Sequence, residues 1–159
     1  MSSNLDRARS YEEKVGKKIP DGQKCVFHLT PEVGWMNDPN GFSLYRGEYH
    51  LFYQYHPYSS VWGPMHWGHQ KTRDFIKWEQ LPCALAPDTE YDGQGCFSGS
   101  AVEHEGKHIL MYTGVLDRVE ADGSHTLRQT QCIAVGDGVN YEKLPANPVI
   151  TADALPEGS

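Results

Sequence analysis

The feature that most constrains the fold of this 159-residue chain is an internal repeat. Residues 46–53 align with residues 105–112, and in both segments a glycine turn precedes an apolar run that ends in tyrosine. Residues 74–82 and 137–145 then share the pattern Asp-x-x-x-aromatic-Glu-x-Leu-Pro. The offset is 59 residues for the first pair and 63 for the second, so the repeating unit is about sixty residues long and contains a small insertion.

The composition of the repeating unit indicates β-structure. From Lys24 onward, short runs rich in Val, Phe, Tyr and Ile are broken by Gly or Pro at intervals of roughly eight to twelve residues. Several strands repeated with a period of about fifty residues are typical of propeller blades. We therefore expect an all-β propeller with a first blade at about residues 35–85, a second at 96–150 and the start of a third. A β-sandwich with chance internal similarity is the alternative.

The N-terminal residues differ from the rest of the chain. A helical period runs from Asn4 to Lys17, with Leu5, Ala8 and Val15 on one stripe together with residue 11 or 12. We expect residues 1–23 to form a helical extension on the outside of the main domain, and residues 24–159 to form an incomplete propeller. Two blades cannot close a ring, because propellers have about four to eight.

The best catalytic candidate lies at the start of the first unit. Residues 34–41 place one acid, Asp38, beside two amides and a tryptophan. The dipeptides at residues 38–39 and 40–41, Asp-Pro and Asn-Gly, are typical of turns, so a hairpin tip is one interpretation. The other is a ligand pocket, in which an aromatic wall surrounds an acid that attacks a hydroxylated ligand or exchanges a proton with it.

A family resemblance favours the pocket. Residues 35–41 resemble the signature of glycoside hydrolase family 32, the invertase-type β-fructofuranosidases, which include sucrose-6-phosphate hydrolases. The resemblance implies a five-bladed propeller followed by a β-sandwich, of which this chain corresponds to an N-terminal part. It also implies that Asp38 is the catalytic nucleophile.

Further positions match the family residue by residue and imply a fructosyl-binding site. They are Asn37, Gln54, Trp62, Phe97 and Ser98. Aromatic faces can pack on the C–H faces of a sugar, while amides and hydroxyls pair with its hydroxyl groups. Because equivalent positions on successive blades are neighbours around a propeller axis, we expect these side chains and Asp38 to face one polar depression.

A retaining glycosidase needs a second carboxyl group, an acid/base, about 5 to 5.5 Å from the nucleophile. The family's Arg-Asp-Pro and Glu-Cys motifs, which the resemblance implies would supply the transition-state stabiliser and the acid/base, do not occur in this sequence. The remaining loop and strand acids read as solvated side chains: Glu90, Asp92, Glu103 and Glu105. This leaves three hypotheses: a fructoside hydrolase whose residues 1–159 are inactive alone, a non-catalytic carbohydrate-binding propeller, or a related enzyme such as a fructosyltransferase or an arabinan-cleaving enzyme.

Charge and spacing argue against other classes of function. The formal charge is −7 and no basic cluster occurs, which disfavours nucleic acid and anionic membranes as partners. No apolar run reaches membrane-spanning length, and residues 1–20 lack a signal-peptide core, so we expect a cytoplasmic protein if Met1 is the native start.

The four cysteines have no C-x-x-C spacing and are expected to be buried thiols. His66 and His69, three apart in a strand, do not suggest a metal site, and we expect no cofactor. The oligomeric state is left open.

Overall fold

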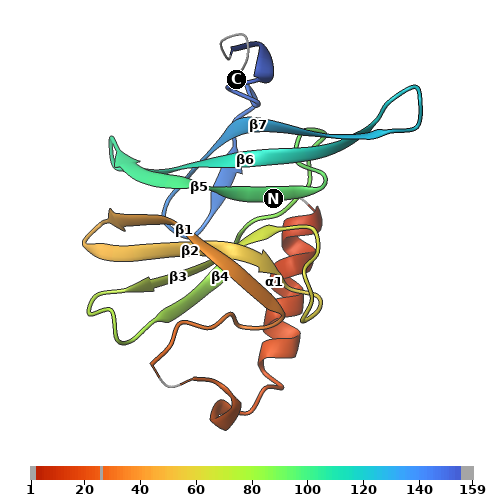
Figure 1. The fold of residues 1–159 in the computed structure, drawn as a ribbon. Coiled ribbons are helices and arrows are strands. Elements are labelled where there is room, and N and C mark those ends of the chain that lie inside the picture. Colours follow the sequence, from red (N-terminus) through yellow and green to blue (C-terminus); the bar gives the residue numbers. More distant parts are fainter. Residues whose placement is uncertain (1–2, 26, 155–159) are drawn as a thin grey trace.

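The computed structural model describes residues 3–25 and 27–154, and within them the chain forms two antiparallel sheets of four strands (Figure 1). The first sheet contains β1 (Trp35–Tyr45), β2 (Glu48–His56), β3 (His66–Thr72) and β4 (Glu79–Leu85), and the second contains β5 (Gly95–His104), β6 (Lys107–Val119), β7 (His125–Gly136) and β8 (Tyr141–Lys143). Each sheet keeps its strands in chain order, so each is a meander. Helix α1 (Ser3–Gly16) and the short helices η1 (Asp21–Gln23) and η2 (Ala152–Ala154) complete the described elements.

The sequence repeat has a structural counterpart in the turns of the two sheets. The β1–β2 turn at Arg46-Gly47 has φ angles of 49° and 76°, and the β5–β6 turn at Glu105-Gly106 has 50° and 73°. Two successive positive φ angles are typical of the two-residue hairpin turn that suits the twist of antiparallel strands. The repeated glycine therefore supplies the second left-handed position of the same turn in both sheets.

The repeated aspartates also have one role. Asp74, after β3, accepts hydrogen bonds from the backbone amides two and three residues further on, at 2.9 and 2.8 Å. Asp137, after β7, does the same at 2.9 and 2.8 Å. Both side chains therefore close the turn that leads into the outermost strand of their sheet.

The main hydrophobic core lies between the two sheets. Side chains from both of them are buried in it, among them Phe52 and Trp67 from the first sheet and Leu110 and Tyr112 from the second. The innermost strands β1 and β5 lie side by side (Figure 1). The two sheets pack against each other through the inner strands β1 and β5 and do not close into a ring, an arrangement that agrees with two successive blades of a propeller.

Helix α1 packs against the first sheet on the side away from the second sheet (Figure 1). Its observed range, Ser3–Gly16, is within one residue of the predicted one at each end, and Leu5 and Ala8 are buried as the stripe predicted. The helix also binds the backbone of the outermost strand β4 at Cys83. Glu12 accepts a hydrogen bond from the Cys83 amide at 3.0 Å, and Arg9 donates one to the Cys83 carbonyl at 2.9 Å.

Some sequence expectations need correction or lie outside the described structure. Cys83, Cys96 and Cys132 are buried as predicted, but Cys25 is exposed, because it lies in the segment between α1 and β1 rather than in a sheet. Residues 155–159, most of the expected start of a third blade, lie outside the described residues. The division into residues 1–23 and 24–159 stays a prediction. No helix in the described part of the chain is long and apolar enough to cross a membrane.

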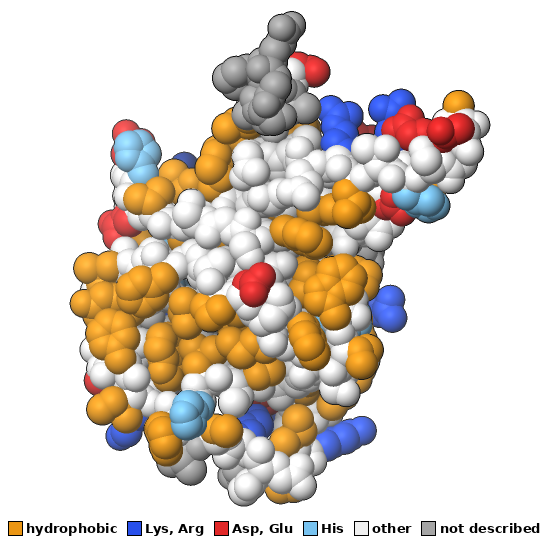
Figure 2. Space-filling model, in the orientation of Figure 1, with side chains coloured by type: hydrophobic (Ala, Val, Ile, Leu, Met, Phe, Trp, Pro, Cys, Tyr) orange, Lys and Arg blue, Asp and Glu red, His pale blue; other side chains and the backbone are white. Residues whose placement is uncertain are grey.

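Exposed hydrophobic side chains gather over the first sheet on the face shown in Figure 2. Phe42 on β1, Tyr49 on β2 and Phe75 in the β3–β4 turn form an aromatic cluster, with ring centroids 4.3 to 6.3 Å apart. Phe42 is 55% exposed and Phe75 50% exposed. The end of the first sheet near the β1–β2 turn therefore exposes an apolar cluster that neither α1 nor the second sheet covers.

Candidate active site

Asp38 lies in an irregular part of strand β1 and not at a hairpin tip. In the pairing of β1 with β2, Asn37 lies opposite Gln54 and Pro39 opposite Tyr53, so Asp38 is an extra residue without a partner. Its φ angle is 28°, which is unusual for a residue with a side chain. An extra residue of this kind is a β-bulge, which bends the strand and redirects a side chain. The turn interpretation was therefore wrong, because a bulge uses the same residue types and the same positive φ angles.

The Asn37 amide is oriented by its neighbour in the motif. The indole nitrogen of Trp35 donates a hydrogen bond to Oδ1 of Asn37 at 2.7 Å. Because an indole N–H can only donate, it fixes which end of the amide is the acceptor. The NH2 group of Asn37 is thereby left to donate to a ligand beside Asp38.

One depression of about 320 Å³ brings together all six side chains that the sequence predicted as site residues. The first sheet and its β2–β3 loop contribute Asn37, Asp38, Gln54 and Trp62, and the second sheet contributes Phe97 and Ser98. Asp38 is exposed to solvent. The depression thus lies across the junction of the two sheets, at the end where β1 and β5 begin (Figure 1).

Two aromatic side chains form one wall of the depression. The rings of Trp62 and Phe97 meet edge to face, with centroids 6.4 Å apart, and Trp62 is 57% exposed. Phe97 precedes a bulge at Ser98, since Phe97 pairs with Thr113 and Gly99 with Tyr112. The wall therefore offers an apolar ring surface next to the polar groups of β1.

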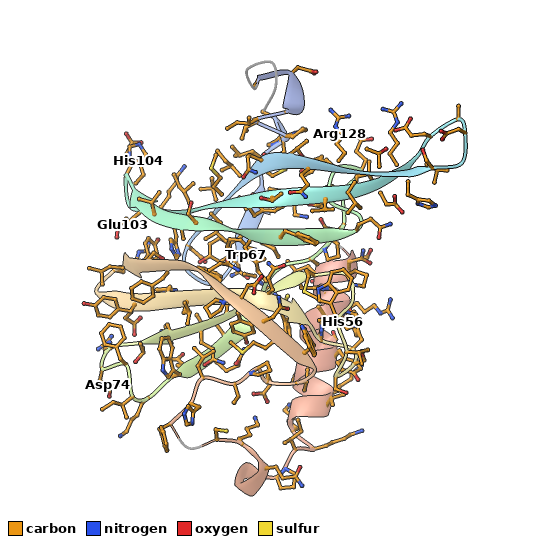
Figure 3. The ribbon with its side chains drawn as sticks, in the orientation of Figure 1. His56, Trp67, Asp74, Glu103, His104 and Arg128 are labelled. Carbon is orange, nitrogen blue, oxygen red and sulfur yellow. The ribbon has the colours of Figure 1, made fainter. Side chains whose placement is uncertain are left out.

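Gln54 and Trp67 connect the two sheets behind the depression. The Gln54 side chain is buried and donates from Nε2 to the carbonyl of Cys96 at 3.0 Å. Trp67 lies between the two sheets (Figure 3), is fully buried and donates from Nε1 to the carbonyl of Phe97 at 3.1 Å. These bonds hold the start of β5 against the first sheet and so set the position of Phe97.

Two residues that sequence reasoning missed also line the depression, Thr113 on β6 and Gln129 on β7. Thr113 had a signal, because it lies 59 residues after Gln54 and so occupies the same place in the repeat. Its hydroxyl is within 3.1 Å of Nε2 of Gln131, which donates to it. Gln129 had no such signal, because it lies near the insertion inside the second repeat, between residues 112 and 137.

Asp38 is the one carboxylate among the described residues that line the depression. Three of the acids predicted to be solvated, Glu90, Glu103 and Glu105, are exposed. Their positions therefore agree with the expectation that they take no part in chemistry at Asp38.

Asp92, the fourth of these acids, is fully buried, and its prediction as a solvated side chain was wrong. It accepts hydrogen bonds from the Tyr112 hydroxyl at 2.8 Å and from Nζ of Lys143 at 2.6 Å, and Lys143 also pairs with Asp88. Burial alone would lower the pKa of Lys143, but the carboxylates of Asp92 and Asp88 raise it above its ordinary value. No local pattern in the sequence predicts this ion cluster, because Lys143 lies on β8 and its partners lie in the connection between the sheets.

Four histidines of the two sheets are buried. His50 and His69 share a hydrogen bond of 2.8 Å, and His108 lies 2.8 Å from the Ser43 hydroxyl. Burial lowers the pKa of each of these histidines, to about 4 for His108, and it lowers the pKa of His66 to about 4. No cluster of His, Cys, Asp and Glu suited to a metal ion occurs among the described residues.

A larger hollow of about 760 Å³ lies between α1 and β4, away from Asp38. Most of the side chains that line it are charged, and most of the charged ones lie on α1. Burial raises the pKa of one of them, Glu12, to about 7, and the hydrogen bond from the Cys83 amide offsets this effect only in part. Since Glu12 and Arg9 bind the edge of β4, this groove reflects the docking of the helix.

Comparison with known proteins agrees with the fold and the motif. The "Glycosyl hydrolases family 32 N-terminal domain" family matches residues 28–158. The chain is 49% identical over 142 residues to a sucrose-6-phosphate hydrolase of Zymomonas mobilis, covering 88% of this chain and 28% of that protein. It is 43% identical over 144 residues to a raffinose invertase of Escherichia coli, covering 90% of this chain and 30% of that protein.

A solved structure agrees closely. The family 32 β-fructofuranosidase of Bombyx mori superposes with a TM-score of 0.83 at 43% identity, covering 98% of this chain and 32% of that one. An aspartate-to-alanine mutant of the same enzyme has been solved in complex with sucrose. Fold and motif thus define a β-propeller of the glycoside hydrolase class, and the superposition confirms the predicted propeller fold over the sandwich alternative. The chain belongs to glycosyl hydrolase family 32, and it spans about 28 to 30% of the length of these curated relatives.

Proposed function

We propose that the protein cleaves β-fructofuranosidic bonds, in sucrose, sucrose 6-phosphate or a related fructoside, by a retaining mechanism with Asp38 as nucleophile. The observation that carries the proposal is the depression that joins Asp38, Asn37, Trp62 and Phe97 across two sheets. The substrate class is supported by the relatives named sucrose-6-phosphate hydrolase and raffinose invertase, and by the mutant of the Bombyx mori enzyme solved with sucrose.

The chemistry follows from the exposed carboxylate. Asp38 would attack the anomeric carbon of the fructosyl unit, forming an ester as the bond to the leaving sugar breaks. The NH2 group of Asn37 would donate to a fructosyl hydroxyl, and the rings of Trp62 and Phe97 would pack on its C–H faces. A proton must reach the leaving oxygen, and no second carboxylate among the described lining residues supplies it.

The experiment is a measurement of fructose release from sucrose by the protein expressed from its complete gene, with Asp38→Asn as the matched variant. The amide is nearly isosteric with the carboxylate but lacks the nucleophilic charge, so we expect turnover to fall by at least 10³-fold with the fold retained. If the variant kept a tenth of the wild-type rate, Asp38 would not be the nucleophile. If the wild-type protein released no fructose from any fructoside, the proposed function would be refuted.

Residues 1–159 by themselves are expected to bind fructose without turning a fructoside over. General acid catalysis typically contributes about 10²- to 10⁴-fold to a rate, and the lining described here offers no group for it. The same observation favours a second candidate function, a carbohydrate-binding propeller without activity. Binding of fructose by the complete protein with no release of product would support that candidate, and transfer of fructosyl groups at high sucrose would instead indicate a transferase.

The cellular location is part of the proposal. A cytoplasmic address is what the N-terminal sequence predicted, and fractionation of the source cells with an antibody to the protein would test it.

A further inference from the structure

The second sheet carries a projecting hairpin that the first sheet lacks. Strands β6 and β7 continue past Val115, the last β6 residue that pairs with β5, and stay paired from Leu116 opposite Arg128 to Val119 opposite His125. We call residues 116–128 the arm. Figure 1 shows the arm extending beyond the end of the sheets at which β1 and β5 begin, which is the end that holds the depression.

The strand register divides the arm into two faces. Directly opposed residues lie on the same face of a sheet, and every second pair along the strands returns to that face. Gln129, which lines the depression, pairs with Val115. The next pairs on its face are Asp117 with Leu127 and then Val119 with His125. The face that borders the depression therefore continues outward through these four side chains.

The chemistry of this face suits a sugar. Leu127 is 61% exposed and Val119 63% exposed, so two apolar side chains face solvent next to a polar site. Between them, Nδ1 of His125 and Oδ2 of Asp117 lie 2.8 Å apart. A carboxylate that accepts from Nδ1–H leaves Nε2 of a neutral imidazole as an acceptor, and the His125 side chain is 64% exposed.

The opposite face is different in character. It carries Arg128 beside Leu116 and Arg118 beside Thr126. Arg128 points away from the first sheet in Figure 3, and Arg118 lies 3.6 Å from Glu120. Both arginines of the arm are thus on the side turned away from the depression.

We propose that the face of the arm formed by Asp117, Val119, His125 and Leu127 binds the neutral sugar unit attached to the fructosyl group. This inference rests on the proposed function. Strands rise about 3.3 Å per residue, so Leu127 lies about 7 Å and His125 about 13 Å beyond Gln129, a span that suits a second sugar ring and the start of a third. The apolar side chains pack on the ring, and Nε2 of His125 accepts a hydrogen bond from one of its hydroxyls. The Asp117 carboxylate repels a phosphate group, so the arm selects an unphosphorylated sugar.

The test separates the second sugar from the fructosyl unit. In the full-length protein carrying Asp38→Asn to prevent turnover, calorimetry measures the dissociation constants of fructose and sucrose. Adding His125→Ala with Leu127→Ala should raise the constant for sucrose at least fivefold and change that for fructose less than twofold. Thr126→Ala, on the opposite face of the same hairpin, is the matched control and should change neither.

Each other result counts against the inference. It is overturned if the paired variant binds sucrose as tightly as the Asp38→Asn parent, or if fructose and sucrose weaken together. The Asp38→Asn protein could instead bind sucrose 6-phosphate more tightly than sucrose and lose this preference when His125→Ala and Leu127→Ala are added. That result would show that the arm selects a phosphate. If the Asp38→Asn protein binds sucrose no more tightly than fructose, the arm proposal alone is refuted. If that protein binds no fructoside, the proposed function is refuted as well.

Discussion

Asp38 and Ser98 occupy the same bulge in the innermost strands of two successive sheets. Each is the extra residue of its strand, and each follows a residue whose partner, Gln54 or Thr113, also lines the depression. The repeat therefore places two redirected side chains beside each other, and the difference between them is chemical: one is a carboxylate and the other a hydroxyl. The first sheet supplies the reactive group and the second a matching contact.

The bulge at Asp38 carries backbone strain that a substitution can reveal. At a φ of 28°, glycine is tolerated and alanine is not, so Asp38→Gly should be more stable to unfolding than Asp38→Ala by about 1 kcal/mol. At the exposed Glu103, in a regular part of β5, Glu103→Ala should be more stable than Glu103→Gly. Glycine there only increases the conformational entropy of the unfolded chain. Urea unfolding of the four variants measures both differences. The same order at both sites would mean that Asp38 is unstrained.

The buried Glu12 should make the protein less stable as the pH rises. Its pKa in the folded protein is about 7, against 4.5 in the unfolded chain, so its contribution is complete below pH 4.5 and is lost as the pH rises to 7. The shift corresponds to about 3 kcal/mol. The advantage of Glu12→Gln over wild type should therefore grow by about that amount between pH 4.5 and 7.5. Glu13→Gln, one residue away on the exposed side of the helix, should show no such growth, and a constant difference for Glu12→Gln would refute the buried, protonated carboxyl.

The buried histidines should make the protein less stable in acid. Burial lowers the pKa of His66 and of His108 to about 4, below the ordinary 6.5. Between these two pH values both rings are neutral in the folded protein and protonated in the unfolded chain. Their contribution is complete above pH 6.5 and is lost as the pH falls to 4. NMR of the imidazole nitrogens at pH 5.5 should find both rings neutral. A protonated His108 at that pH would contradict the burial described here.

The ion cluster at Lys143 should be costly to break from one side. Lys143→Met leaves the fully buried Asp92 without its cation, and we expect a loss of about 3 to 5 kcal/mol in the free energy of unfolding. Adding Asp92→Asn to that variant should recover part of the loss, since a neutral amide is cheaper to bury. Lys17→Met, which breaks the exposed pair with Glu13, should hardly change stability. Equal effects of the two lysine variants would mean that the cluster is solvated.

Much of this structure could be predicted because the sequence contains local signals for it. The glycine turns, the turn-closing Asp74 and Asp137 and the apolar stripe of α1 each depend on residues close together in the chain. The motif around Asp38 predicted a site but not its backbone, because a turn and a bulge need the same residues. Burial of Asp92 could not be predicted, since it depends on Lys143, which is 51 residues away in sequence.

The contact between α1 and Cys83 has a consequence for how the molecule behaves in a crowded cell. Strand β4 is the outer edge of its sheet, and an uncovered edge is a template on which strands of other chains can pair. Glu12 and Arg9 occupy the amide and the carbonyl of Cys83, as a neighbouring strand would. The helix therefore covers this part of the sheet edge, so that a strand of another molecule cannot pair with β4 at Cys83. By this contact α1 protects the protein against edge-to-edge aggregation.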